Sequence, residues 1–429
     1  MKAVLADLCE AIVDCEHKTA PPGDGFALSV GTRAMKEGRL VADACKPVSE
    51  PTYNAWTRRL RPVPGDLVLA REAPVGQVIR VPNDLRVCLG QRTVLLRPDD
   101  EKVVPRFLHY WLLGPDAQGM MSAQASGATV PHLNVDDIRA LDTSRLPDDS
   151  GLQSFAAGTL GALDDAIENN QQRVDLLERM AQTIYREWFV NFRFAGHENA
   201  TFVDSPLGSI PEGWRVVIAS ELITAGALEV GDGYRAKNLE MLPSGEGLSF
   251  LRVANVRDGY LDLVDCDQLP VAYANRVGGK VSQAGDSVIC MKGTVGRSAF
   301  VSYEIPQLVY SPQVSYWRSL DHGQLPPEYL NLWIRSGDFL EQCAAVKGAT
   351  DMADYVNLKD QRRMRVLIPP EVIAGLFVDQ VRDLLRTAAT LRQQRERVSA
   401  VRDLLLPKLV TGEIDVSKLD LDALVERVA

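Results

Sequence analysis

Two stretches of the chain repeat apolar residues at alternating steps of four and three, with almost no Gly or Pro between them. We expect long helices within residues 151–195 and 371–415, because this spacing places the apolar residues along one helix face. The same spacing is typical of a coiled-coil seam. The predicted seam, which would face a partner helix, comprises Leu163, Ile167, Asn170, Leu177, Ile184, Trp188, Leu384, Leu391, Val398 and Leu405.

The rest of the chain carries short alternating apolar runs bounded by Gly, Pro and polar residues. DLVLA at 66–70 and DSVICM at 286–291 are examples. Such runs predict short β-strands joined by turns. We therefore expect two β-rich modules, over residues 1–150 and 196–370, and a short tail over 416–429.

Segments of the first half of the chain recur in the second half in the same order. VPGDLVLAREAPVGQV aligns with QAGDSVICMKGTVGR, placing Gly65 over Gly285, and PRFLHYWLL aligns with PEYLNLWIR, placing Pro105 over Pro327. The two helical stretches align as well, and all these offsets lie between 220 and 222 residues. Self-similarity at one nearly fixed offset predicts an internal duplication of a β-rich module followed by a long helix.

We expect the two helices to pair with each other, because an isolated amphipathic helix is marginal in water. Antiparallel pairing would place the modules at opposite ends of a shared rod. The predicted fold is therefore α+β, with two β-rich modules joined by two long antiparallel coiled-coil helices in an internal pseudo-twofold repeat. A helix of about 40 residues is about 60 Å long, which exceeds one turn of DNA, about 34 Å.

Three polar residues interrupt the seam of the two helices. Asn170 either fixes the register of the helix pair or lies at its solvated margin. Arg395 and Arg402 are expected to extend their guanidinium groups to solvent or to pair with Asp or Glu.

Composition and charge limit the possible classes of protein. The chain has 429 residues, 46% of them hydrophobic, which suffices for two or more packed domains. No apolar run is long enough to cross a bilayer, and Asp7 and Glu10 interrupt the opening segment, so we expect a cytoplasmic location. The formal net charge of -10 counts against nucleic-acid binding unless basic residues cluster locally or partners supply charge. The seven cysteines form no CxxC pair and are expected to be reduced.

Four sequence words at the joints between these segments resemble those of one known family. They are IVDCEHKTAP, IYREWFVNFRF, GSIPEGW and LLLPKLVTGEI, which begin at Ile12, Ile184, Gly208 and Leu404. Together with the order of modules and helices, they resemble the type I restriction-modification specificity subunits, often called HsdS. The resemblance covers almost the whole chain.

This resemblance implies a function in phage defence. The two modules would be target recognition domains, each reading one half of a split site in double-stranded DNA. Two modification (methyltransferase) subunits would pack on the helices and methylate adenine, and restriction subunits would add translocation and cleavage. S-adenosylmethionine, ATP and Mg²⁺ would bind those partner subunits, whereas this chain would hold no cofactor, contact no membrane and be non-catalytic.

Candidate DNA-binding residues are polar or basic side chains in loops next to Gly, because such loops can approach bases and phosphates closely. In the first module they are His17, Lys18, Thr19, Gln91, Arg92, Thr129 and His132. In the second module they are Tyr234, Arg235, Lys237, Lys292, Thr294, Arg297, Gln313, Lys347 and Thr350.

Signatures of catalytic and metal sites are missing from the sequence. No histidine lies at ligand spacing from Cys, Asp or Glu, so no metal site is expected. The chain lacks a GxxxxGK[ST] phosphate loop, a GxSxG word and the Asn/Asp-Pro-Pro-aromatic word of adenine methyltransferases. The aromatic pair Trp188 and Phe189 is expected to pack in a core rather than stack on bases.

Other functions remain open at this stage. The chain could be the specificity subunit of another phage-defence methylation system. It could also be a coiled-coil scaffold whose modules bind protein, an alternative that the acidic composition favours. A fused restriction-methylation polypeptide would need a catalytic domain, for which this length leaves no room.

Overall fold

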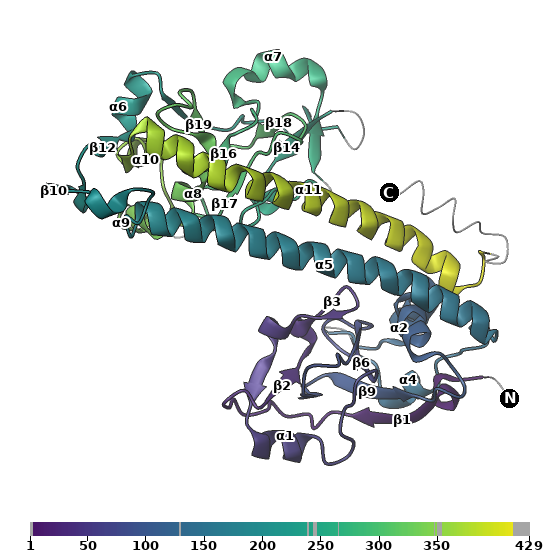
Figure 1. The fold of residues 1–429 in the computed structure, drawn as a ribbon. Helices are drawn as coiled ribbons and strands as arrows, with labels where there is room; N and C mark the ends of the chain where they lie inside the picture. The colour runs from purple at the N-terminus through teal and green to yellow at the C-terminus, as the bar shows by residue number, and fades with distance from the viewer. Residues whose placement is uncertain are drawn as a thin grey trace. The chain divides into compact units, whose positions relative to one another are not determined.

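The computed structural model describes residues 3–127, 130–237, 240–242, 247–264, 266–346, 348–349 and 354–414. The chain divides into two compact units. The first unit contains the chain up to Asn169 and again from Gln394 onward, and the second contains Asn170–Gln393. Each unit has its own β-rich module and includes one segment of each long helix, α5 (Ser150–Phe189) and α11 (Glu371–Val410) (Figure 1).

The module of the first unit is built on two sheets. A four-stranded antiparallel sheet has the order β1-β9-β6-β7, and a three-stranded sheet has the order β5-β2-β8, in which β2 and β8 are parallel. Every residue of β6 is buried, which explains its continuous apolar run. The strands are β1 (Cys9–Asp14), β2 (Ala27–Val30), β5 (Lys46–Val48), β6 (Leu67–Ala70), β7 (Val78–Arg80), β8 (Val87–Leu89) and β9 (Thr93–Pro98), with a small hairpin of β3 (Met35–Lys36) and β4 (Arg39–Leu40).

The module of the second unit repeats this topology. Its four-stranded antiparallel sheet has the order β13-β19-β16-β17, and its three-stranded sheet has the order β15-β14-β18, with β14 and β18 parallel. The strands are β13 (Leu228–Asp232), β14 (Leu248–Leu251), β15 (Asp267–Leu269), β16 (Ser287–Cys290), β17 (Ser298–Phe300), β18 (Leu308–Tyr310) and β19 (Val314–Ser319). The same order and direction in both modules confirm the predicted internal duplication.

The second unit also contains pairs of strands outside this repeat. β12 (Arg215–Ile218) pairs with β22 (Arg365–Ile368), and β10 (Phe202–Ser205) pairs with β11 (Gly208–Pro211). A short pair links β20 (Gly348–Ala349) to β21 (Asp354–Tyr355).

Short helices follow the sheets at repeated positions. In both copies two helices follow the last strand of the four-stranded sheet, and Pro at the first turn starts α2 and α8. Asn134 and Asn357 then occupy the N-cap position of the next short helix. The Asn357 side chain accepts a hydrogen bond from the Asp360 amide over 2.9 Å, whereas Asn134 Nδ2 donates to the Asp137 carboxylate over 3.1 Å. The helices are α1 (Glu50–Trp56), α2 (Pro105–Leu113), α3 (Pro115–Gln124), α4 (Val135–Arg139), α6 (Ala219–Thr224), α7 (Ala274–Val277), α8 (Pro327–Ile334), α9 (Gly337–Val346) and α10 (Leu358–Gln361).

Segments of α5 and α11 pack antiparallel within each unit. In the first unit Asp164 pairs with Arg402, and Leu152, earlier in α5, lies beside Gly412, later in the chain. In the second unit Glu178 pairs with Arg392, and the Trp188 ring lies 5.9 Å from the Phe377 ring. In both units, residues with higher numbers in α5 contact residues with lower numbers in α11, so the two segments run antiparallel. The fold is therefore the predicted α+β arrangement with antiparallel coiled-coil helices.

The predicted seam residues are all buried or half-buried. In the second unit Val174, Leu177, Ala388 and Leu391 form a separate apolar cluster between the two helices. Asn170 is half-buried. Arg402 pairs with acidic side chains, as expected, and its own side chain is only 13% exposed.

The helix α5 ends at Phe189, before the end of the predicted helical stretch. Phe192 adopts a left-handed conformation with a φ of 54°, which cannot continue the helix. The rings of Phe192 and Phe194 pack 5.5 and 5.2 Å from the Trp214 ring, so the chain turns to cover the core of the second unit. Phe189 is buried in that core and Trp188 packs against it, as expected for core residues. Among the described residues no helix combines the length and apolar character needed to cross a bilayer.

Candidate nucleic-acid interface

Candidate residues of the first module meet at one rim of its four-stranded sheet. His17 and Thr19 follow β1, and Gln91 lies in the link between β8 and β9. Thr19 Oγ1 donates a hydrogen bond to Gln91 Oε1 over 3.1 Å, and Gln91 Nε2 donates to the His17 carbonyl over 3.1 Å. The Gln91 amide therefore fastens the segment around Lys18, whose side chain is exposed between the two bonded residues.

Arg92 and His132 lie at the same rim. Arg92 is 51% exposed, has a φ of 69°, and its Nε lies 3.4 Å from Glu72 Oε1. The backbone of Glu72 forms a bridge with that of His132, which brings the loop after α3 beside the link that carries Arg92. The structure thus brings together six of the seven candidates of this module, and the seventh, Thr129, lies outside the described residues.

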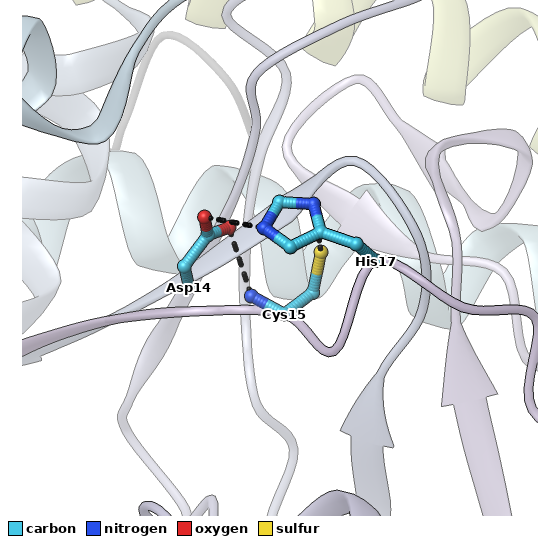
Figure 2. A group of neighbouring side chains, drawn as sticks. All are labelled: Asp14, Cys15 and His17. Carbon is cyan, nitrogen blue, oxygen red and sulfur yellow. Dashed lines mark hydrogen bonds and ion pairs between the residues drawn. The ribbon is translucent and has the colours of Figure 1, made fainter.

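An ionic network orients the His17 ring (Figure 2). Asp14 Oδ2 lies 2.9 Å from His17 Nε2, and Arg71 Nη1 donates to the same oxygen over 2.8 Å. On the other side of the ring, His17 Nδ1 lies 4.0 Å from the sulfur of the buried Cys15. His17 has a φ of 52°, so the network holds the chain in a left-handed turn at this point.

The expectation that no histidine lies near other ligand-type residues is wrong at this place. Asp14, Cys15 and His17 each offer one possible ligand atom, and these three atoms lie within 4.8 Å of one another. A metal ion could bridge atoms at that separation. However, the Asp14 oxygen nearest the ring already accepts the guanidinium of Arg71. A fixed positive charge at that distance opposes a bound cation, so the geometry fits an ionic network better than a metal centre.

Sequence reasoning missed two arginines beside this network. Arg58 Nη2 donates to Glu16 Oε2 over 3.3 Å, and Arg59 Nη1 donates to the Asp14 carbonyl over 3.4 Å. Both side chains keep large exposed fractions, 68% and 49%. The signal was present as the basic word TRRLR, but its nearness to the loop around His17 depends on the fold. These arginines give the rim a local positive charge that can contact phosphates.

Candidates of the second module follow equivalent strands. Arg235 and Lys237 follow β13 and are exposed, while Tyr234 is half-buried with the Arg276 guanidinium 5.9 Å from its ring centre. Lys292 and Thr294 follow β16 and are exposed as well. Because β13 is the counterpart of β1 in the repeated strand order, the loop that carries Arg235 and Lys237 corresponds to the loop around His17 in the first module.

Lys280 is a further basic residue that sequence reasoning did not single out as a reader. Its Nζ donates to Asp232 Oδ1 over 3.1 Å and to the Gly233 carbonyl over 2.7 Å. Asp232 ends β13 as Asp14 ends β1, and each aspartate faces the second residue of the neighbouring strand. A basic side chain thus contacts the end of the first strand in both modules, Arg59 in the first and Lys280 in the second.

One candidate of the second module is held inside the module, and two others lie outside the described residues. Arg297 is half-buried and its Nη2 donates to the Val253 carbonyl over 2.7 Å, so its guanidinium is committed to the module itself. Lys347 and Thr350 lie outside the described residues. Gln313 is exposed in the link before β19.

Comparisons with known proteins point to one family. No model of a known protein family matches the chain. The specificity subunit of the type I restriction enzyme MjaIX of Methanocaldococcus jannaschii is 23% identical over 380 residues, which cover 87% of this chain and 82% of that protein. The specificity subunit of the type I restriction enzyme HindI of Haemophilus influenzae is 20% identical over 415 residues, covering 82% and 86%.

One solved structure has a similar fold along almost the whole chain. It is the S subunit of a type I restriction-modification system from M. genitalium, with a TM-score of 0.56 and 14% identity. The similarity covers 96% of each chain. The similarity thus includes both modules and both long helices.

Proposed function

Because the chain belongs to the family of type I restriction-modification specificity subunits, we propose that it is the DNA-reading subunit of such a system. Each module would read one half of a bipartite site in double-stranded DNA. Two similar but unequal readers predict two unequal half-sites. The paired helices would set the number of base pairs between the half-sites.

The observation that carries this proposal is the repeated rim with different side chains. In both modules an aspartate ends the first strand of the four-stranded sheet, a basic side chain contacts that strand end, and exposed polar residues surround it. Arg, Lys, Gln and Thr side chains are the groups that contact phosphates and base edges. A shared frame with unequal donors is what reading two different half-sites requires.

We propose that methyl transfer and cleavage reside on partner subunits. Two modification subunits would bind the helices, and restriction subunits would join the complex, as the family resemblance implies. The sequence lacks the methyltransferase and phosphate-loop words, which supports this division of labour. Partner subunits would also supply the positive charge that a chain with a net charge of -10 lacks.

Selection from a randomised DNA pool tests this function. The chain would be reconstituted with its modification subunits and incubated with duplexes carrying a long random region, and the bound duplexes would be sequenced. We expect enrichment of two short motifs at a fixed spacing. A pool without enrichment would instead favour a protein-binding scaffold, and methyl transfer by the chain alone would contradict the division of labour.

A further inference from the structure

The two modules share one backbone frame around the link that precedes the second strand of each four-stranded sheet, β9 in the first module and β19 in the second. The Arg71 amide donates to the Arg92 carbonyl over 2.9 Å, and the Met291 amide donates to the Gln313 carbonyl over 3.2 Å. Arg92 immediately precedes β9 and Gln313 immediately precedes β19. Arg92 and Gln313 therefore occupy one position of the repeat.

Further backbone contacts fix the surroundings of this position in the same way. The carbonyl of Arg71 accepts from the Leu133 amide over 2.9 Å, and the carbonyl of Met291 accepts from the Val356 amide over 3.0 Å. On the neighbouring loops, Glu72 bridges His132, and Lys292 bridges Tyr355. The backbone hydrogen bonds around this position are thus the same in both modules.

The exposed side chains on this frame differ in chemistry. Glu72 lies opposite Arg92 in the first module, and its carboxylate is 3.4 Å from the Arg92 Nε. Lys292 takes the place of Glu72 in the second module, beside Gln313, and both are exposed. Among the described residues, neither the Gln313 amide nor the Lys292 ammonium has a hydrogen-bond partner, so both groups are available to a ligand.

A backbone frame that is the same in both modules but carries different polar side chains is expected where the two modules read different bases. Two parallel donors of arginine match the O6 and N7 acceptors of guanine, whereas the glutamine amide matches N6 and N7 of adenine. A carboxylate beside an arginine fixes the plane of the guanidinium, which favours a paired contact. Gln91, the neighbour of Arg92, has one N–H and its oxygen engaged by the loop around His17.

We propose that Arg92 and Gln313 are the equivalent base-reading residues of the two modules, Arg92 taking a guanine and Gln313 an adenine. Glu72 is a positioning residue for Arg92, and Gln91 positions the loop around His17 without reading a base. The assignment rests on the proposed function, since it requires that both modules contact DNA.

Exchanging the two side chains tests this assignment. Wild-type, Arg92→Gln and Gln313→Arg chains would each be reconstituted with the modification subunits and used to select duplexes from a randomised pool. Arg92→Gln should change one guanine to adenine in one half-site, and Gln313→Arg should change one adenine to guanine in the other. A paired contact discriminates against the wrong base by roughly tenfold or more, so the preference should reverse clearly.

Controls separate reading from charge and from folding. Arg145→Gln removes the same charge from an arginine that is 80% exposed elsewhere in the first unit, and should leave the motif unchanged. Glu72→Gln should weaken the guanine preference in the half-site that Arg92→Gln alters, without a new preference. Arg92→Lys keeps the charge and should retain affinity while reducing guanine discrimination.

Several outcomes would overturn the assignment while leaving the function intact. These are a wild-type split motif that both exchange variants retain, an equal loss of affinity for all sequences, or changes in both half-sites from one substitution. If Arg92→Gln does not fold, Arg92→Lys and Gln313→Arg decide the matter in the same assay. A wild-type pool without a split motif would instead refute the proposed function.

Discussion

Arg318 and Asp286 form a bidentate ion pair in the interior of the second module. Arg318 Nε donates to Asp286 Oδ1 over 2.7 Å, Nη2 donates to Oδ2 over 2.8 Å, and the two side chains are only 4% and 0% exposed. The first module has the same pair between Arg97 and Asp66, with distances of 2.9 and 2.8 Å. In both modules the arginine lies in the second strand of the sheet, β9 or β19, and the aspartate lies in the turn before the third strand, β6 or β16. The duplication therefore extends to individual polar contacts.

Removal of the Asp286 carboxylate should destabilise the second unit strongly. Asp286→Ala removes the bidentate partner of the buried Arg318 guanidinium, which keeps Glu229 Oε2 at 3.1 Å and the Val281 carbonyl at 2.9 Å. The loss should be about 3 kcal/mol, since breaking a buried pair leaves its charge incompletely compensated. Asp66→Ala is the matched control and should cost less, because Arg97 is 21% exposed and can be hydrated. Denaturant unfolding of both variants measures the difference. A loss below about 1 kcal/mol for Asp286→Ala would contradict a stabilising role for this pair, and equal losses in the two variants would contradict the effect ascribed to burial.

The buried histidine of α2 should make stability depend on pH. Burial lowers the pKa of His109 to about 4, and its Nε2 lies 3.3 Å from the Val78 carbonyl. The unfolded chain binds this proton near pH 6.5, whereas the folded chain binds it only near pH 4. The free energy of unfolding should therefore fall by about 3 kcal/mol as the pH drops through that interval.

His109→Asn tests this expectation, because the equivalent residue of the second module is Asn331, which has no acidic transition of this kind. Unfolding free energies of wild type and variant would be measured between pH 7 and pH 4. The unfolding free energy of the wild type minus that of the variant should fall by about 3 kcal/mol between pH 7 and pH 4, whatever the substitution costs at pH 7. A constant difference across the range would show that His109 does not titrate as expected.

Asp164 joins three parts of the first unit. Its Oδ1 accepts from Arg39 Nη2 over 3.0 Å and from Arg402 Nη1 over 3.1 Å, and its Oδ2 accepts from the Tyr110 hydroxyl over 2.7 Å. Burial raises the pKa of this carboxyl, but the hydrogen bond from Tyr110 and the two guanidinium groups outweigh it, so the pKa lies below its usual value.

Asp164→Ala should therefore cost about 3 kcal/mol of unfolding free energy, since it leaves two largely buried guanidinium groups without their shared partner. The neighbouring Asp165 is 70% exposed and pairs with the half-buried Arg106, so Asp165→Ala should cost less than about 1 kcal/mol. Denaturant unfolding measures both losses, and hydrogen exchange should increase near Arg402 only in the first variant. Similar losses in the two variants would disprove the role of Asp164.

The sequence predicted the duplicated modules, the long helices and their antiparallel pairing, because apolar spacing reports directly which faces are buried. It did not predict that Gln91 binds the loop around His17, because the two residues meet only through the strand order of the sheet. Arg297 resembled a reader in sequence, yet it donates to Val253 inside the module. The left-handed conformations of His17 and Arg92 also left no sign, since neither residue is glycine.

Lengthening both helices should move the half-sites apart. Seven residues that continue the seam would be inserted after Asn169 in α5 and after Gln393 in α11, which preserves the heptad register. Each helix becomes about 10 Å longer, equal to about three base pairs of DNA. Pool selection should return both half-sites unchanged with a longer spacer, whereas a four-residue insertion in one helix should disrupt the seam and lower stability. An unchanged spacer would contradict the role of the helices.

The most direct test of two independent readers is an exchange of residues 1–150 with the corresponding residues of a family member that recognises a different site. The reconstituted complex would be used to select duplexes from a randomised pool, beside the unaltered chain. The account predicts that one half-site becomes that of the donor, while the other half-site stays the same. Replacement of the whole recognised sequence, or no change in either half-site, would contradict it.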